Sequence, residues 1–242
     1  MIDTHAHLDA LGEDPAAVVA RARAAGVSRI LTIGTDQAVA LAGSHEAVYA
    51  VVGIHPHDAG DPYDVDLLRG LLAHPKAVAV GEIGLDYFRE YAPHDAQAEL
   101  FDAQLELASE LGKPVVIHTR AADTDTLAHL ERFEGTVVLH CFSSPHLLPT
   151  ALERGWYVSF AGNVTYRNAS DLRVAATQVP ADRLLAETDC PYLAPQPVRG
   201  RKNEPAFVMH TLAGLAEARN EDPAELEAQI DANARACFDL PA

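Results

Sequence analysis

The sequence opens with two histidines separated by one residue, in the stretch MIDTHAHL. Residues i and i+2 of an extended chain point to the same side, so the imidazoles of His5 and His7 can reach one metal ion. The ends of a chain usually fray and carry little function. A pair of ligands in this place therefore predicts that the first residues are held inside the fold.

Further side chains of the kinds that bind divalent metals stand at the ends of apolar runs. They are His55 in YAVVGIHPH, Glu82 in VAVGEIGLD, His118 in VVIHTR, His140 in VVLHC and Asp189 in LLAETDCP. Taken singly, a histidine after an apolar run is typical of an ordinary hydrogen-bonded residue. A buried carboxylate without a partner is costly, so an acid at the end of a buried strand indicates a nearby cation. Together with the first histidine pair, these residues predict a metal centre.

The number of donors predicts two divalent ions per chain. Six side chains supply the predicted ligands: His5, His7, Glu82, His118, His140 and Asp189. The first ion takes the N-terminal histidine pair and Asp189, the second takes the two later histidines, and Glu82 bridges them. Mixed imidazole and carboxylate ligation suits zinc, manganese or iron, and magnesium that keeps bound waters is the alternative. Two cations about 3.5–4 Å apart hold the attacking and leaving oxygens of a hydrolytic displacement, so we predict metal-assisted hydrolysis.

The elements that must position these residues alternate along the chain. Eight apolar or β-branched runs are predicted as strands: 1–5, 29–35, 49–55, 77–85, 114–119, 136–142, 157–161 and 184–189. Helices lie between them, with one beginning at Asp14 and Pro15, one covering residues 95–111, and the last beginning at Asp222 and Pro223. Several strand runs are continuously apolar, which is typical of parallel strands buried on both faces.

This alternation predicts one α/β domain over residues 1–242, folded as a (β/α)8 barrel of the TIM type. A doubly wound open sheet is the competing fold, but no glycine-rich phosphate loop follows the first strand. The carboxyl ends of all strands in a barrel form one face, where such enzymes build their active sites. In a closed barrel the first strand lies between two neighbours, which explains how a terminus can carry ligands.

The charge balance limits the kind of partner. With 18 basic and 35 acidic residues and a net charge of −17, the chain has no basic stripe of the kind that an extended duplex-binding face needs. A polyanionic substrate must then be held locally. The densest basic cluster contains Arg199, Arg201 and Lys202, and we interpret this loop, with Asn203 and Glu204, as a phosphate clamp. Glu204 is expected to order Arg199 or a water on the metal, and a solvated loop is the alternative.

Three further features bear on where the protein acts. No apolar run approaches the roughly 18 residues that a membrane span needs, and the first residues carry no cationic leader. Cys141, Cys190 and Cys237 form no CxxC motif and cannot all pair, so we interpret them as reduced thiols of a cytoplasmic protein. We predict a monomer without a membrane or an obligate protein partner.

Seven motifs follow one another over essentially the whole chain: DTHAHLD, GIHPH, GEIGLDYF, HCFS, ETDCPYLAP, RGRKNEP and NARACF. In order and spacing they resemble the signatures of TatD-family metal-dependent deoxyribonucleases, within the amidohydrolase superfamily. The resemblance implies a TIM-type barrel, a binuclear metal centre and phosphodiester hydrolysis, as a 3′-to-5′ exonuclease acting on single-stranded DNA or DNA 3′ ends. Carried over position by position, it implies the same six ligands as the strand ends.

Two positions depart from the family pattern. Ser144 stands where the family motif HCFSG has its glycine, so this loop is expected to take a different turn. Cys190 stands where a serine or alanine is commoner. We interpret it as a small residue that faces away from the site, and a thiolate ligand is the alternative.

The predicted roles follow from the ligand arrangement. Asp189 is the predicted general base, since a carboxylate on one metal can also accept the proton of the attacking water; ligation alone is the alternative. Glu82 is the second predicted catalytic residue, because it bridges the ions. His55 is predicted to contact the scissile phosphate or the leaving group, or else to support a ligand. His57 is expected to turn outward with its loop.

Aromatic residues gather in two loops that the predicted barrel brings to the same face. They are Tyr87, Phe88, Tyr91 and Tyr192. Aromatic side chains in this place can stack on unpaired bases, and packing as a lid over the site is the alternative.

Nuclease activity has two competitors. A small-molecule hydrolase of the same superfamily would cleave an ester, lactone or amide, and such relatives often bridge their metals with a carboxylated lysine. Lys76 and Lys113 precede their predicted strands, so Glu82 as the bridge favours the nuclease. A non-catalytic binding barrel is disfavoured by the intact set of ligands.

Overall fold

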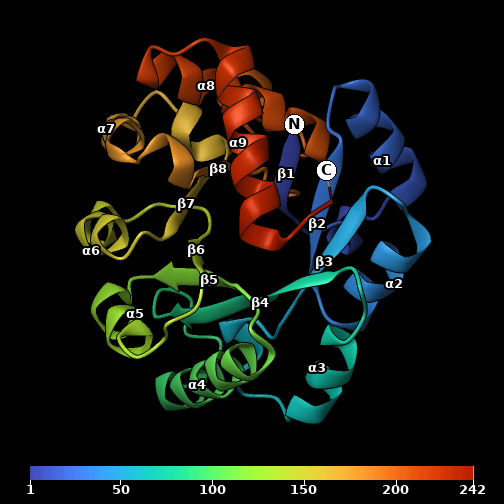
Figure 1. The fold of residues 1–242 in the computed structure, drawn as a ribbon, viewed down its shortest axis with the longest axis vertical. Coiled ribbons are helices and arrows are strands. Elements are labelled where there is room, and N and C mark those ends of the chain that lie inside the picture. The colour runs from blue at the N-terminus through green and yellow to red at the C-terminus, as the bar shows by residue number, and fades with distance from the viewer. Residues whose placement is uncertain (242) are drawn as a thin grey trace.

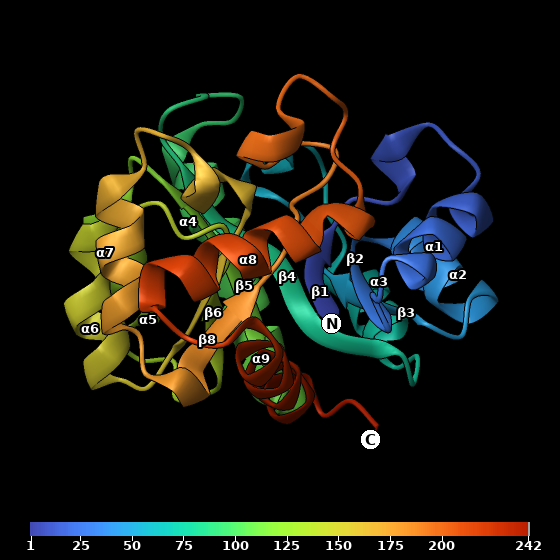
Figure 2. The same cartoon turned by 90° about the horizontal axis from the view of Figure 1, so that it is seen from above.

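The computed structural model describes residues 1–241 and contains eight strands arranged around a common axis (Figures 1 and 2). The strands are β1 (Ile2–Ala6), β2 (Arg29–Gly34), β3 (Val48–Val52), β4 (Ala77–Asp86), β5 (Val115–Arg120), β6 (Val137–Leu139), β7 (Tyr157–Phe160) and β8 (Leu184–Ala186). Each strand pairs in parallel with the next, so the sheet order is the chain order. The predicted TIM-type α/β barrel is confirmed.

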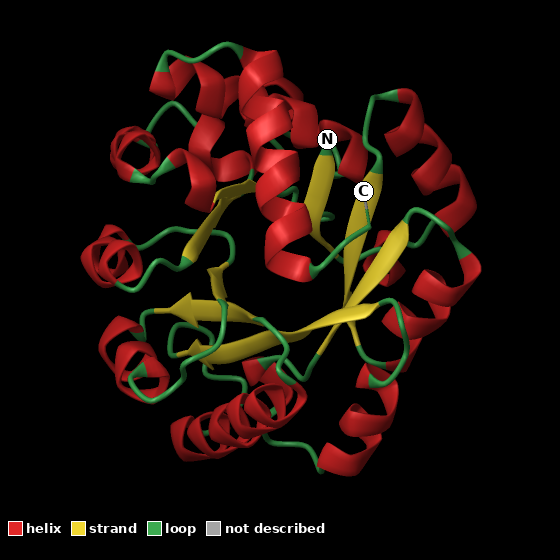
Figure 3. Ribbon diagram, in the orientation of Figure 1, coloured by secondary structure: helices red, strands yellow, loops and turns green. Residues whose placement is uncertain are grey.

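Helices surround the sheet, as Figure 3 shows in red. They are α1 (Pro15–Ala24), α2 (Asp36–Ser44), α3 (Val65–Leu72), α4 (His94–Leu111), α5 (Asp123–Leu130), α6 (Leu148–Glu153), α7 (Ser170–Gln178), α8 (Val208–Arg219) and α9 (Pro223–Phe238). Predicted caps set several ends, because Asp14 and Asp222 accept hydrogen bonds from the first turns of α1 and α9. Within residues 1–241, none of these helices is long and apolar enough to cross a bilayer.

Helix α9 closes the amino-terminal end of the barrel. One buried cluster contains side chains from several strands together with residues of α9: Ile2, Leu31, Val51, Val116, Leu185, Ala234 and Phe238. Asn233 of α9 also donates to the carbonyl oxygen of Leu184, at the start of β8. Figure 2 shows α9 at the end of the barrel opposite to the orange loop that follows β8. The apolar side chains of α9 therefore cover the amino-terminal end of the barrel.

The first and last strands meet through contacts near the carboxyl ends. Ala6 bridges to Cys190, the Asp189 amide donates to the His5 carbonyl oxygen at 2.9 Å, and the His7 amide donates to the Cys190 carbonyl oxygen at 2.8 Å. On its other side, β1 pairs with β2. The N-terminal histidines are thus held on both sides, as the sequence predicted.

Three strands are clearly shorter than predicted, among them the run 136–142, which is a strand only over Val137–Leu139. The run 49–55 ends as a strand at Val52, because Pro56 starts a short 3-10 turn just beyond His55. The run 184–189 ends as a strand at Ala186, and Asp189 has a left-handed φ of 55° that a regular strand does not contain. Both functional residues therefore lie on the loops beyond the strand ends.

Candidate metal centre

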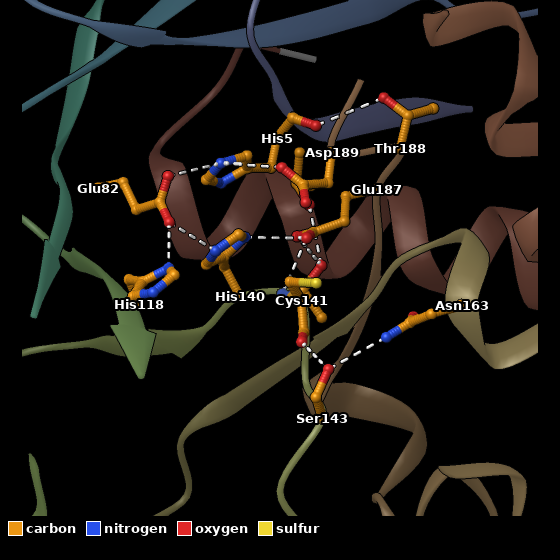
Figure 4. A network of polar contacts seen from close by, with 12 residues as sticks. His5, Glu82, His118, His140, Cys141, Ser143, Asn163, Glu187, Thr188 and Asp189 are labelled. Atoms are coloured by element: carbon orange, nitrogen blue, oxygen red, sulfur yellow. Dashed lines mark hydrogen bonds and ion pairs between the residues drawn. The ribbon is translucent and has the colours of Figure 1, made fainter. Parts of the chain in front are cut away.

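The six predicted ligands come together at the carboxyl-end face. Figure 4 shows five of them, His5, Glu82, His118, His140 and Asp189. His5 lies in β1, Glu82 in β4 and His118 in β5, whereas the others follow their strands by one to three residues. Glu82 is 3% exposed, so its charge is held inside the protein. Metal binding by these residues stays a prediction, but their convergence on one point is a feature of the fold.

The two oxygens of Glu82 divide the histidines into two groups. Oε1 lies 2.6 Å from His118 Nδ1 and 2.8 Å from His140 Nε2. Oε2 lies 3.3 Å from His5 Nε2 and 3.6 Å from His7 Nε2. The carboxylate therefore has the orientation that a bridge between two cations requires.

Asp189 completes the side that holds the N-terminal pair. Its Oδ1 lies 3.5 Å from His7 Nε2 and 3.8 Å from His5 Nε2. Donor atoms of three groups each lie within 4.8 Å of one another: His5, His7 and Glu82; His5, His140 and Asp189; Glu82, His118 and His140. The first and third groups contain parts of the two predicted ligand sets, whereas the second joins His140 to His5 and Asp189 across those sets. The division of the ligands between two ions stays a prediction.

His5 provides the test of whether a metal fits. Its side chain is fully buried, and neither ring nitrogen has a hydrogen-bond partner. Burial lowers the pKa of His5 to about 4, so the ring is neutral and offers a lone pair at neutral pH. A buried polar group without a partner is costly. A cation bound to Nε2, the ring nitrogen that faces Glu82, would remove the cost at that atom.

The remaining charges also favour cations. Burial opposes a charge on His140, but the carboxylates of Glu82 and Glu187 outweigh it and raise the His140 pKa well above its usual value. Burial likewise opposes a charge on Glu82, yet His140 and His55 lower the Glu82 pKa well below its usual range. The cluster thus keeps its carboxylate ionised and attracts positive charge, either as protons or as metal ions.

Two acids at the site were missed by the sequence reasoning. Glu187 is 1% exposed, and its Oε1 lies 3.0 Å from His140 Nδ1 and accepts from the Cys141 amide at 2.8 Å. Asp86 Oδ2 lies 3.2 Å from His118 Nε2. Spacing could have found both, because Glu187 stands two residues before Asp189 and Asp86 stands four residues after Glu82, at same-side positions of an extended chain.

The prediction that His57 turns outward is wrong. Its Nε2 lies 2.7 Å from Asp86 Oδ2, and its backbone amide donates to His55 Nδ1 at 3.1 Å. The short 3-10 turn that begins at Pro56 brings the His57 side chain back over the end of β4. His55, His57 and His118 consequently form a fourth group of donor atoms beside Glu82.

Close packing of β4 against β5 depends on Gly84. Its φ of 139° is strained for other residues, and a Cβ atom here would collide with the His118 carbonyl oxygen. Gly84 lies midway between Glu82 and Asp86, so the glycine allows both carboxylates to reach His118.

The loop from 199 to 204 differs in detail from its predicted role. Arg199 covers the ring of Tyr166 at 3.9 Å, and Arg201 lies 5.2 Å from the ring of Phe207. Both guanidinium groups belong to exposed residues, so they stay available to a phosphate. Lys202 instead donates to the carbonyl oxygen of Leu11, at the start of the chain.

Asn203 and Glu204 have structural partners. Asn203 is fully buried, and its amide nitrogen donates to the carbonyl oxygens of Thr188 and Tyr192. Glu204 pairs with Arg21 at 2.6 Å, not with Arg199. The expected Glu204–Arg199 contact was wrong because α1 brings Arg21 nearer, and both residues act on loop position in this structure.

The two departures from the family pattern have local explanations. Ser144 has an extended φ of −120° and its hydroxyl donates to Asp123, so this position requires no glycine. Cys190 is fully buried in the core. No group of metal donor atoms within residues 1–241 includes it.

Comparison with known proteins agrees with the geometry. The family model described as TatD related DNase matches residues 2–239. The chain belongs to the TatD family. A member from Bacillus subtilis, the uncharacterized metal-dependent hydrolase YabD, is 38% identical, with 98% of each chain covered. A 3′-5′ ssDNA/RNA exonuclease TatD from Klebsiella pneumoniae is 40% identical over 92% of this chain and 91% of its own.

A solved structure of another TatD homologue supports the same assignment. The crystal structure of YJJV from Escherichia coli K12 superposes with a TM-score of 0.94 at 32% identity and covers 100% of this chain and 98% of its own. The chain is thus a metal-dependent hydrolase of the TatD family, within the amidohydrolase superfamily, on a TIM-type barrel.

Proposed function

We propose that this TatD-family hydrolase is an exonuclease that removes nucleotides from the 3′ end of single-stranded DNA, using two divalent ions. The observation that carries the proposal is the cluster around Glu82, in which one buried carboxylate faces five imidazoles. The relatives named as 3′-5′ ssDNA/RNA exonucleases support the choice of substrate, and their names extend it to RNA.

The proposed ions are held in two overlapping sets. His5, His7 and Asp189 would hold one ion, His118 and His140 would hold the other, and Glu82 would serve both. A pair of divalent ions supplies Lewis acidity to the phosphoryl oxygens and acidifies a water at neutral pH. Zinc, manganese and magnesium are the candidates. Mixed imidazole and carboxylate ligands favour zinc or manganese over magnesium.

Asp189 is the proposed general base, accepting the proton of the attacking water at a carboxylate oxygen. The Asp189 side chain is 12% exposed, so it faces the opening of the site as well as the histidines. Its backbone amide is fixed on the His5 carbonyl oxygen, which limits its movement. General-base catalysis of this kind contributes about 10²–10⁴-fold.

His55 is the proposed contact to the scissile phosphate or the leaving oxygen. Because its Nδ1 accepts the His57 amide, a neutral His55 carries its proton on Nε2. This Nε2 lies 3.3 Å from Glu82 Oε1 and therefore points into the cluster as a donor. The guanidinium groups of the exposed residues Arg199 and Arg201 hold further phosphates of the strand, next to the scissile one.

The proposal is tested with metal-loaded protein and single strands labelled at the 5′ end. A 3′-to-5′ exonuclease shortens such strands one nucleotide at a time, and a blocked 3′ end stops it. A parallel panel of esters, lactones and amides tests the small-molecule alternative. If the protein hydrolysed a member of this panel faster than every nucleic acid, the small-molecule hydrolase would replace the nuclease as the assigned function.

A further inference from the structure

The exposed aromatic side chains of the protein gather around the metal centre. Within residues 1–241, three Phe, Tyr or Trp side chains have more than half of their surface exposed: Phe88 at 60%, Tyr91 at 65% and Tyr192 at 58%. All three lie in the loops after β4 and β8, on the carboxyl-end face. Exposed apolar surface at the rim of a polar site marks contact with a ligand.

Two of these rings contact histidines at opposite ends of the cluster. The Tyr192 ring centroid lies 5.9 Å from that of His7, and the Tyr91 centroid lies 4.8 Å from that of His57. The paired rings meet at 72° and 84°, so neither histidine stacks on its tyrosine. A row of contacts through Glu82, His118 and Asp86 separates the two pairs.

Both tyrosine loops are fixed to the site. Asp86 Oδ1 accepts from the amides of Phe88 and Arg89, at 2.9 and 3.0 Å, while its Oδ2 contacts the histidines. The Tyr192 amide donates to the Asp189 carbonyl oxygen at 2.9 Å. The tyrosines therefore keep a defined position relative to the predicted metal ligands.

Phe88 differs from the tyrosines. The guanidinium group of Arg120 lies over its ring, 4.0 Å from the centroid. One face of Phe88 is already covered, so this ring supports a cation. Tyr91 and Tyr192 are the rings left with open surface.

We propose that Tyr91 and Tyr192 are platforms on which unpaired bases stack, on the two sides of the phosphodiester that is cleaved. This inference rests on the proposed nuclease function. Every base has a face that can stack on an aromatic ring, so the platforms are tolerant of sequence. Bases inside a duplex have their faces occupied by neighbours, and extruding one costs unpairing energy. The platforms thereby make an unpaired end the substrate.

Stacking is measured directly with an oligonucleotide that carries fluorescent 2-aminopurine at its 3′ terminus. The metal-loaded Asp189→Asn protein keeps the strand intact during the measurement. Binding should quench the fluorescence. One of the variants Tyr91→Leu and Tyr192→Leu should remove much of the quenching of the terminal probe, the other should do so for a probe at the next-to-last position, and the matching Phe variants should keep it. Leu67→Ala is the control, because Leu67 is an equally exposed apolar residue, 60% exposed on α3, that carries no aromatic ring.

Kinetics give the second measurement, with the wild-type protein and strands whose last two nucleotides are abasic. Loss of each stacked base should lower kcat/KM by about 5- to 100-fold, so the end with two abasic nucleotides should lose at least that much. Tyr192→Leu should lower kcat/KM on the normal strand and respond less to base removal. Equal kcat/KM for normal and abasic ends would overturn the platforms and leave the nuclease function standing. Absence of cleavage on every nucleic acid would overturn the proposed function instead.

Discussion

At the scale of single residues, Asp189 carries the sharpest prediction. Asp189→Asn keeps the size of the side chain and a ligating oxygen but cannot accept a proton. We expect cleavage to fall by at least about 100-fold, while DNA affinity changes little. Single-turnover rates and strand binding of the metal-loaded protein measure the two quantities separately.

Two results would contradict the role of Asp189 as base. One is near wild-type turnover at saturating metal. The other is a loss of activity that added metal fully restores, which would leave Asp189 as a ligand alone. Metal content measured by elemental analysis distinguishes weakened ligation from lost proton transfer.

Glu187 is predicted to act through His140. Glu187→Gln keeps the shape of the side chain but removes the charge that faces His140 Nδ1. Substitution of a carboxylate that supports a metal ligand lowers metal affinity or activity roughly 10- to 100-fold. We therefore expect Glu187→Gln to lower metal affinity by about this factor. Metal titration of the variant is the measurement. Glu153→Gln, an exposed change on α6, is the control, and equal affinities of the two variants would contradict the role.

The sequence placed the six ligand candidates at one end of the barrel because each ends an apolar run. It did not reveal Glu187 or Asp86, although both lie at same-side spacing from predicted ligands. Their partners, His140 and His118, come from strands far along the chain, and only the barrel shows which side chains meet. The Arg21–Glu204 pair was missed for the same reason, since the two residues are 183 positions apart.

At the scale of elements, the loop after β8 is predicted to hold phosphates through few charges. Arg199→Ala or Arg201→Ala should weaken strand binding and leave metal content unchanged. Because few phosphates are neutralised, the logarithm of the binding constant should fall only gently with the logarithm of salt concentration. Arg69→Ala on α3, whose charge pairs with Glu110, is the control. A steep salt dependence would place the interface elsewhere.

Strand β1 is predicted to depend on α9. Asp231 of α9 accepts a hydrogen bond from the buried Ile2 amide at 2.7 Å. Asp231→Ala leaves this amide without a partner, which costs about 1–3 kcal/mol of unfolding free energy. Urea denaturation measures the loss. Glu221→Ala removes only an exposed partner of Arg219 and should change little, so similar losses in both variants would contradict the argument.

Deletion of residues 1–4 should be more severe. All four residues are at most 3% exposed, and β1 carries His5. We expect the deleted protein to lose its cooperative unfolding transition in circular dichroism. A stable deletion that still binds metal would show that the first strand is dispensable.

The alternation of strands and helices was readable from the sequence, because buried parallel strands are continuous apolar runs. Two features were not readable. Strand ends depend on backbone angles such as the left-handed φ of Asp189. The place of α9 depends on which surface of the barrel is left uncovered, and Ala234 and Phe238 look like an ordinary helix face in the sequence.

At the scale of the whole molecule, the rate at which buried cysteines are alkylated measures how often the fold opens. Cys190 and Cys237 are 0% and 5% exposed, and burial raises the pKa of both thiols. At pH 8 we therefore expect very slow alkylation of Cys190 and Cys237 in the folded protein, faster as pH rises, and reaction of all three cysteines in denaturant. Mass spectrometry of the labelled peptides measures each site. Fast labelling of Cys237 alone would show that α9 detaches from the barrel on its own.

The seam between β1 and β8 has a consequence for how the protein is made. Asp3 accepts from the hydroxyl of Thr188, 185 positions later, and Asp189 is anchored on the carbonyl oxygen of His5. On a ribosome the first histidines emerge long before their acidic partner has been translated. The nascent chain would thus carry the predicted ligands His5 and His7 without Asp189, and we expect the predicted site to be complete only after the residues that follow β8 have been added.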